Sequence, residues 1–187
     1  MGCGIGRGTF PYLEMFPEAE VHAIDVAAPQ LRYAHARAEA FGRCIHFSQQ
    51  SAEATDFPDG SFDLVVSHGL CHETSGKAIR NIMSEIHRVL RPGGITMHSD
   101  PQLGRGLDPH DAFVHDWDTD YNNESFWGPL HDIGATDLCV TAGFPAASVR
   151  EAWATIDASG SPAILMANDT DSELNRSSLF GARKAAA

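Results

Sequence analysis

The pattern of apolar and polar positions changes along the chain between helical spacing and short strand-like runs. It predicts helices and strands that follow one another. The clearest helix is predicted over residues 77–90, where apolar side chains recur at helical spacing and charged ones face away. A second helix is predicted over residues 29–41, and Gly42 closes it. Short runs rich in apolar or β-branched residues predict four strands, over residues 21–25, 44–48, 62–67 and 95–99.

Weaker signals complete the predicted order of elements. Helices are expected near residues 9–16 and 130–142, and late strands over residues 149–156 and 178–184, whereas residues 157–177 are ambiguous. Residues 101–129 are polar and acidic with little periodicity, which predicts an irregular lid or substrate loop. The alternation predicts one α/β domain over residues 1–187, with a mostly parallel sheet flanked by helices and a late antiparallel strand.

Composition narrows the classes of function. Lys and Arg number 13 against 25 Asp and Glu, so the net charge of −12 argues against nucleic-acid and anionic-membrane partners. The sequence holds no apolar run near the roughly 20 residues that a membrane helix needs. Four widely spaced cysteines without a CxxC pair favour reduced thiols and, with no sign of a signal peptide, a cytoplasmic location.

The first residues form a glycine-rich turn, with glycine at positions 2, 4, 6 and 8. Such a turn before a helix binds negative or hydrogen-bonding ligand groups, and Asp25 follows about 20 residues later at the end of a predicted strand. This pair indicates a cofactor that contains a nucleoside. The spacing is G-x-G-x-G, and Arg7 or Thr9 stands where a dinucleotide fingerprint needs its third glycine, which argues against an NAD-type oxidoreductase.

Six short motifs recur along the chain in a characteristic order. They are GCGIGRGT at 2–9, IDV at 24–26, SAE at 51–53, FPDGSFD at 57–63, EIHRVLRPGG at 85–94 and SLFGARK at 178–184. Together they resemble class I S-adenosylmethionine-dependent methyltransferases of the small-molecule type. The resemblance covers residues 1–100 well and the last predicted strand moderately, and it implies a Rossmann-like fold.

By position, the resemblance implies where S-adenosylmethionine would bind. The glycine turn would hold its methionine part, Asp25 its ribose hydroxyls, and residues 51–53 its adenine, with Ser51 standing where the family usually has an acid. The implied cofactor-binding residues are Gly2, Cys3, Gly4, Gly6, Asp25, Val26, Ser51, Ala52, Glu53, Ser67 and His68.

The family also implies a central strand before the glycine turn, and no residues precede the turn here to form it. We therefore expect a sheet that lacks its first central strand, in a truncated or mis-started chain, with a homodimer as one way to complete it. Buried ladder groups left unpaired would cost about 1–3 kcal/mol each.

Histidines supply the candidates for acid–base chemistry. The segment from His68 to Glu73 also holds Cys71 and His72 at ligand-like spacing, but no further ligand pair is evident, so no metal residues are assigned. His72, His68 and His115 are the candidate catalytic bases, because neutral imidazole accepts a proton near pH 7. An ordinary loop histidine remains the alternative interpretation of His72, and a solvated acidic loop that of residues 110–124.

The sequence therefore predicts methyl transfer from S-adenosylmethionine to a small-molecule acceptor. The acidic segment favours a neutral or basic acceptor over a polyanion. The alternative is a truncated or degenerate domain that holds the cofactor without turnover.

Overall fold

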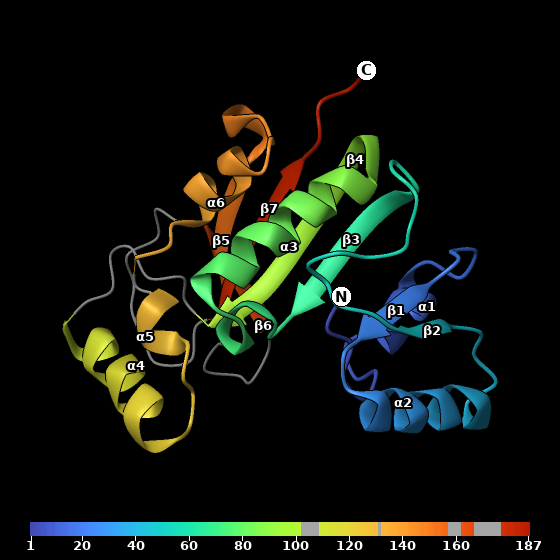
Figure 1. Ribbon diagram of the computed structural model, residues 1–187, viewed down its shortest axis with the longest axis horizontal. Coiled ribbons are helices and arrows are strands. Elements are labelled where there is room, and N and C mark those ends of the chain that lie inside the picture. Colours follow the sequence, from blue (N-terminus) through green and yellow to red (C-terminus); the bar gives the residue numbers. More distant parts are fainter. Residues whose placement is uncertain (102–108, 131, 157–161, 167–176) are drawn as a thin grey trace. The chain divides into compact units, whose positions relative to one another are not determined.

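The computed structural model in Figure 1 describes residues 1–101, 109–130, 132–156, 162–166 and 177–187. Their contacts group the chain into two compact units, Met1–Asp56 and Phe57–Ala187, and each unit is described by itself. The single domain expected from chain length stays a prediction.

The first unit is a pair of parallel strands with two helices. Its elements are α1 (Phe10–Met15), β1 (His22–Asp25), α2 (Ala28–Ala40) and β2 (His46–Gln49). The strands pair in register from His22 opposite His46 to Asp25 opposite Gln49. A small core of Leu13, Ala23, Ala38 and Ile45 holds the helices and strands of this unit together. Within the unit, α2 runs along the β1–β2 pair (Figure 1).

The second unit contains a mixed sheet of five strands in the order β3-β4-β7-β5-β6. The strand β3 is parallel to β4, and the other three pairs are antiparallel. Its elements are β3 (Phe62–His68), η1 (Cys71–Glu73), α3 (Gly76–Val89), β4 (Leu90–Pro101), α4 (Pro109–Tyr121), α5 (Trp127–Leu130), α6 (Ala135–Thr141), η2 (Ala146–Ser148), β5 (Arg150–Ile156), β6 (Pro162–Met166) and β7 (Ser177–Arg183).

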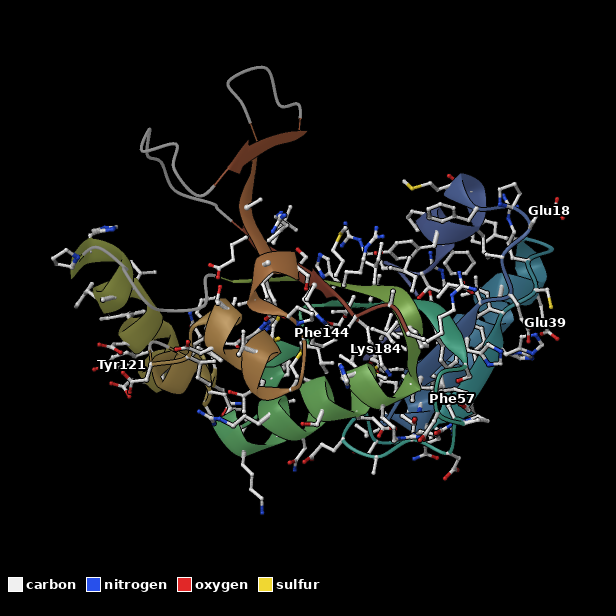
Figure 2. The ribbon with its side chains drawn as sticks, turned by 90° about the horizontal axis from the view of Figure 1, so that it is seen from above. Glu18, Glu39, Phe57, Tyr121, Phe144 and Lys184 are labelled. Carbon is white, nitrogen blue, oxygen red and sulfur yellow. The ribbon has the colours of Figure 1, made fainter. Side chains whose placement is uncertain are left out.

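The helix α3 is the main cover of this sheet, and α6 lies beside it on the same face (Figure 1). Ser75 caps α3 by accepting a hydrogen bond from the Ala78 N–H at 3.2 Å. Ile79, Met83 and Ile86 are almost fully buried, and burying each such side chain contributes about 1.5–3 kcal/mol. At the far end, Lys184 Nζ donates to the carbonyl oxygens of His87 and Leu90, each at 2.8 Å (Figure 2).

The strand β7 inserts beside β4 with little room between the backbones. A Cβ at Gly181 would overlap the carbonyl oxygen of Thr96, its neighbour across the strands. The next residue back, Phe180, is buried and stacks on the ring of His98 with centroids 4.8 Å apart. The order Phe180 then Gly181 therefore suits this register of β7, because a one-residue slip would turn Phe180 out of the interior and bring a side chain against the Thr96 carbonyl.

The predicted α/β fold is confirmed, and the predicted helices and strands form with ends shifted by a few residues. The pairs β1–β2 and β3–β4 are parallel, and the sheet of the second unit also contains three antiparallel pairs. In the described residues, β1 pairs with β2 alone and β3 pairs with β4 alone. On the other edge of β1, the Ile24 carbonyl oxygen accepts a hydrogen bond from the Cys3 N–H at 3.0 Å.

The prediction of an irregular segment over residues 101–129 was wrong for the part that forms α4 and α5. Aromatic side chains recur four residues apart in α4, at Phe113, Trp117 and Tyr121, with ring centroids 6.3 and 4.3 Å apart. This spacing is helical, but the rings form an exposed row rather than a buried stripe, so the usual amphipathic signal is weak. None of the helices in the described residues is long and apolar enough to cross a membrane.

Candidate cofactor and acid–base site

The glycine turn lies directly against the end of β1. Gly2, Gly4 and Gly6 have φ angles of 64°, 52° and 79°, which L side chains rarely adopt, so the turn requires glycine at these positions. A Cβ on Gly6 would also come within 3.1 Å of the Phe10 ring. Burial first, and then the charge of Asp25, raises the pKa of the Cys3 thiol to about 11, so this thiol stays neutral beside the turn.

The Asp25 carboxylate joins the turn to the strand. Its Oδ2 accepts a hydrogen bond from the Gly4 N–H and its Oδ1 one from the Ala27 N–H, both at 2.8 Å. The residue is half-buried, and each oxygen keeps a second lone pair for another donor. The backbone of the turn and the carboxylate thus lie together, as the sequence predicts.

The residues around Asp25 fit a nucleoside. Val26, the next residue, leaves 65% of its surface exposed and offers an apolar contact for a flat base. Ala52 is buried, whereas Ser51 and Glu53 are exposed on a short turn in which Ser51 Oγ accepts from the Glu53 N–H at 3.2 Å. The Ser51 hydroxyl keeps its proton and one lone pair for a ligand.

Two of the predicted cofactor residues belong to the second unit. Ser67 is buried, and its Oγ lies 2.7 Å from His98 Nδ1, so this hydroxyl serves the interior of the sheet. His68, at the end of β3, is exposed. Burial lowers the pKa of His98 to about 4, which keeps the ring neutral between Ser67 and Thr96.

A histidine–aspartate pair forms where β4 ends. The Asp100 side chain is fully buried, and Oδ1 lies 2.7 Å from His72 Nδ1. An ionised carboxylate only accepts hydrogen bonds, so Nδ1 donates and the proton-accepting nitrogen of a neutral His72 is Nε2. The same carboxylate accepts the backbone N–H groups of Leu70, Cys71 and His72 at 2.9–3.0 Å.

The surroundings of His72 favour its protonated form. Burial lowers its pKa, but the hydrogen bond and charge of Asp100, with the charges of Glu73 and Glu124, outweigh that effect and raise the pKa above its usual value. Trp127 lies edge-to-face against the imidazole, with ring centroids 5.6 Å apart. This combination of a held ring and a shifted pKa is typical of a catalytic base.

The three candidate bases thus differ in their surroundings. His72 is held and half-buried, His68 is exposed, and the side chain of His115 in α4 lies outside the described part of the structure. The sequence gives no direct sign that Asp100 is the partner of His72, because 28 residues separate them. The one signal is that His72 follows β3 and Asp100 lies at the carboxyl end of the parallel strand β4, and such ends meet at the same sheet edge.

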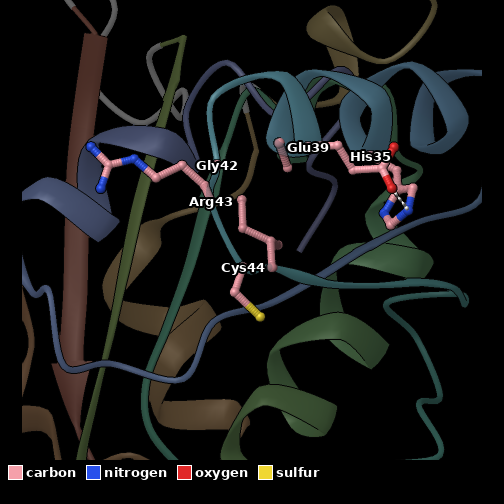
Figure 3. Close-up of a pocket in the computed structure, with 7 residues that line it drawn as sticks. His35, Glu39, Gly42, Arg43 and Cys44 are labelled. Carbon is pink, nitrogen blue, oxygen red and sulfur yellow. Dashed lines mark ion pairs between the residues drawn. The ribbon is translucent and has the colours of Figure 1, made fainter.

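A shallow hollow at the end of α2 is separate from these residues. Figure 3 shows it lined by His35, Glu39, Gly42, Arg43 and Cys44, with an ion pair of 3.5 Å between His35 and Glu39. None of the predicted site residues lines it. The hollow therefore has no part in the candidate site.

Comparison with known sequences identifies the family. A sequence profile of the methyltransferase domain matches residues 1–94, half of the chain. The demethylmenaquinone methyltransferase of Thermus thermophilus is 36% identical over 95 residues, which cover 50% of this chain and 42% of that protein. A malonyl-[acyl-carrier protein] O-methyltransferase of a Paenibacillus species is 31% identical over 117 residues, covering 61% and 42%.

Solved structures agree on the fold. A SAM-dependent methyltransferase from Methanosarcina mazei matches with a TM-score of 0.68 and 17% identity, covering the whole of this chain and 91% of that one. A SAM-dependent methyltransferase from Thermotoga maritima, described as a possible histamine N-methyltransferase, matches with a TM-score of 0.68 and 15% identity, covering 98% and 79%.

The chain belongs to the methyltransferase domain family, and the resemblance to class I S-adenosylmethionine-dependent methyltransferases is confirmed. S-adenosylmethionine is the cofactor of this family. The chain spans about two fifths of the length of the curated relatives described here.

Proposed function

We propose that this chain binds S-adenosylmethionine and transfers its methyl group to an apolar small molecule. The observation that carries the proposal is the Asp25 carboxylate, which hydrogen-bonds the Gly4 N–H of the glycine turn. One carboxylate thereby fixes the turn for the methionine part and presents free lone pairs to the ribose hydroxyls. Exposed Val26 supplies the apolar contact for the adenine.

Bound S-adenosylmethionine supplies an activated methyl group on a sulfonium. The protein's own task is then to hold the acceptor in line and to remove its proton where it has one to lose. His72 is suited to the second task, because Asp100 fixes its ring and leaves Nε2 as the proton acceptor. The proton from an acceptor O–H or N–H would move to Nε2 of His72. His68 and His115 remain the other candidate bases.

The acceptor is proposed to be apolar because of the row of rings on α4. Phe113, Trp117 and Tyr121 are 62%, 49% and 69% exposed, an unusual apolar surface for one helix. We assign this row to the acceptor, in line with the lid or substrate segment expected over residues 101–129. The two relatives described here are named for demethylmenaquinone and for malonyl-[acyl-carrier protein]. Acidic residues around the row disfavour a polyanion as the acceptor.

Four free cysteines, Cys3, Cys44, Cys71 and Cys139, support the proposed cytoplasmic location. A homodimer stays a prediction.

The test is transfer of a labelled methyl group. The chain is incubated with methyl-labelled S-adenosylmethionine and a panel of phenols, long-chain carboxylic acids and aryl amines. Labelled product with wild type and its loss in Asp25→Ala support the proposal. Tight binding of S-adenosylhomocysteine without product for any acceptor supports the alternative, a domain that holds the cofactor without turnover.

A further inference from the structure

We propose that Glu20, His22 and His46 form a binding site for a divalent late first-row transition ion such as Zn²⁺. His22 Nε2 lies 2.9 Å from Glu20 Oε1, and His46 Nε2 lies 3.7 Å from the same oxygen. All three ligand atoms lie within 4.8 Å of one another. Two imidazole nitrogens and a carboxylate oxygen thus converge on one point at the surface of the first unit.

The fold brings these residues together from distant parts of the sequence. His22 begins β1 and His46 begins β2, and the two are partners in the parallel register. The backbone fixes this pairing, since the His46 N–H donates to the Val21 carbonyl at 2.9 Å. The imidazole rings stack with centroids 4.8 Å apart and planes at 25°. Both Nε2 atoms lie within 3.7 Å of the same Glu20 oxygen, so they face the same side.

The distances of the two histidine nitrogens from the Glu20 oxygen suit a tetrahedral ion. Two ligand atoms about 2.0–2.1 Å from a tetrahedral Zn²⁺ lie about 3.3 Å apart, and the two observed separations of 2.9 and 3.7 Å bracket that value. Three protein ligands leave the fourth position for water. Imidazole with one carboxylate selects zinc, copper or nickel over Ca²⁺ and Mg²⁺, which prefer oxygen ligands alone.

An ion reaches this site from solvent without any movement of the chain. The side chains of His22, His46 and Glu20 are 28%, 53% and 71% exposed. Such an open site with three ligands binds less tightly than a closed structural site, which has four. The ion would link β1 to β2 directly and so stabilise a pair of strands that buries only a small core.

The site is separate from the proposed methyl transfer. His22 is the first residue of β1 and Asp25 the last, so the ion and the cofactor bind at opposite ends of the strand. The proposal therefore stands or falls independently of the proposed function. The sequence offers no motif for it, because 24 positions separate the two histidines and only the strand register joins them.

The test is a titration of Zn²⁺ into the tag-free full chain, followed by calorimetry and by competition with a chromophoric chelator. We expect one equivalent to bind, with affinity reduced at least about tenfold in His22→Gln and in His46→Gln. The matched control is His35→Gln, which removes an exposed histidine that also pairs with a glutamate, Glu39, and this variant should bind as wild type does. Circular dichroism checks that each variant is folded, and Co²⁺ in place of Zn²⁺ should give the visible absorption of a tetrahedral site.

A second group, His72, Glu73 and Glu124, also has three ligand atoms within 4.8 Å and serves as the competing location. Loss of binding in His72→Gln with unchanged affinity in His22→Gln and His46→Gln would overturn the proposal. Absence of Zn²⁺ binding to wild type would overturn it as well.

Discussion

A single carboxylate oxygen, Oδ1 of Asp100, accepts hydrogen bonds from both the backbone N–H and the ring Nδ1 of His72, at 3.0 and 2.7 Å. The backbone of His72 and its side chain are therefore fixed by the same buried group. Because Asp100 is the penultimate residue of β4 and His72 lies in η1 after β3, the pairing of these two strands determines where the imidazole stands.

Removing the charge of Asp100 should move the pH dependence of methyl transfer. The carboxylate raises the pKa of His72, so Asp100→Asn lowers it, and the base form of His72 persists to lower pH. The acidic limb of the kcat profile should shift to lower pH while kcat falls. His72→Gln should abolish that limb and lower kcat about 10²–10⁴-fold, with the affinity for S-adenosylhomocysteine unchanged. The control is Asp63→Asn, an exposed carboxylate at the other end of β3, and an unmoved limb in Asp100→Asn would contradict the role of Asp100.

Most elements of the fold follow from the sequence because their signals are local. The apolar stripe of α3 and the glycine turn beside Asp25 are patterns within about 25 residues. The partner of His72 could not be predicted in this way, because it depends on which strands pair. The contact between the two histidines of β1 and β2 depends on strand pairing in the same way. The helix α4 went undetected because its apolar positions lie outward, and a periodicity argument looks for a buried face.

Buried His98 should make the folded state sensitive to acid. Its pKa is lowered to about 4 in the fold, against an ordinary value near 6.5, so the unfolded chain binds the proton first. The free energy of unfolding should therefore fall as pH drops from about 6.5 to 4, by about 3 kcal/mol from this residue. Urea unfolding across this range measures the slope, and His98→Gln should flatten it while lowering stability throughout. An equal slope in both proteins would mean that other groups cause the acid sensitivity.

Gly181→Ala should destabilise the second unit. The added methyl group meets the Thr96 carbonyl oxygen, so β7 must move away from β4, at a cost of about 1–3 kcal/mol. Thermal unfolding followed by circular dichroism should show a lower melting temperature. Ser84→Ala, a change at an exposed position of α3, is the comparison and should be close to neutral; an unchanged melting temperature in Gly181→Ala would show that the strands are not this closely packed.

The row of rings on α4 should affect the acceptor and not the cofactor. Trp117 stands between Phe113 and Tyr121, so Trp117→Ala removes the middle of the surface proposed to contact an apolar acceptor. We expect KM for the acceptor to rise about tenfold, since an aromatic contact contributes about 1 kcal/mol or more. The Kd of S-adenosylhomocysteine should not change. The control is Val140→Ala, which shortens an exposed apolar side chain on α6 and should leave both constants unchanged. Equal KM values for Trp117→Ala and wild type would show that the row of rings does not contact the acceptor.

Asp25 is the residue on which the proposed cofactor site depends most directly, and calorimetric titration of S-adenosylhomocysteine into wild type and Asp25→Ala tests its role. Charged hydrogen bonds contribute about 1.5–3 kcal/mol each, so losing those to the ribose should weaken binding at least tenfold. Glu53→Gln, at an exposed carboxylate on the adenine side, should have a smaller effect. We expect micromolar binding by wild type and a large loss of binding in Asp25→Ala. Equal affinity in the two proteins, or no binding by wild type, would contradict the proposed role of Asp25.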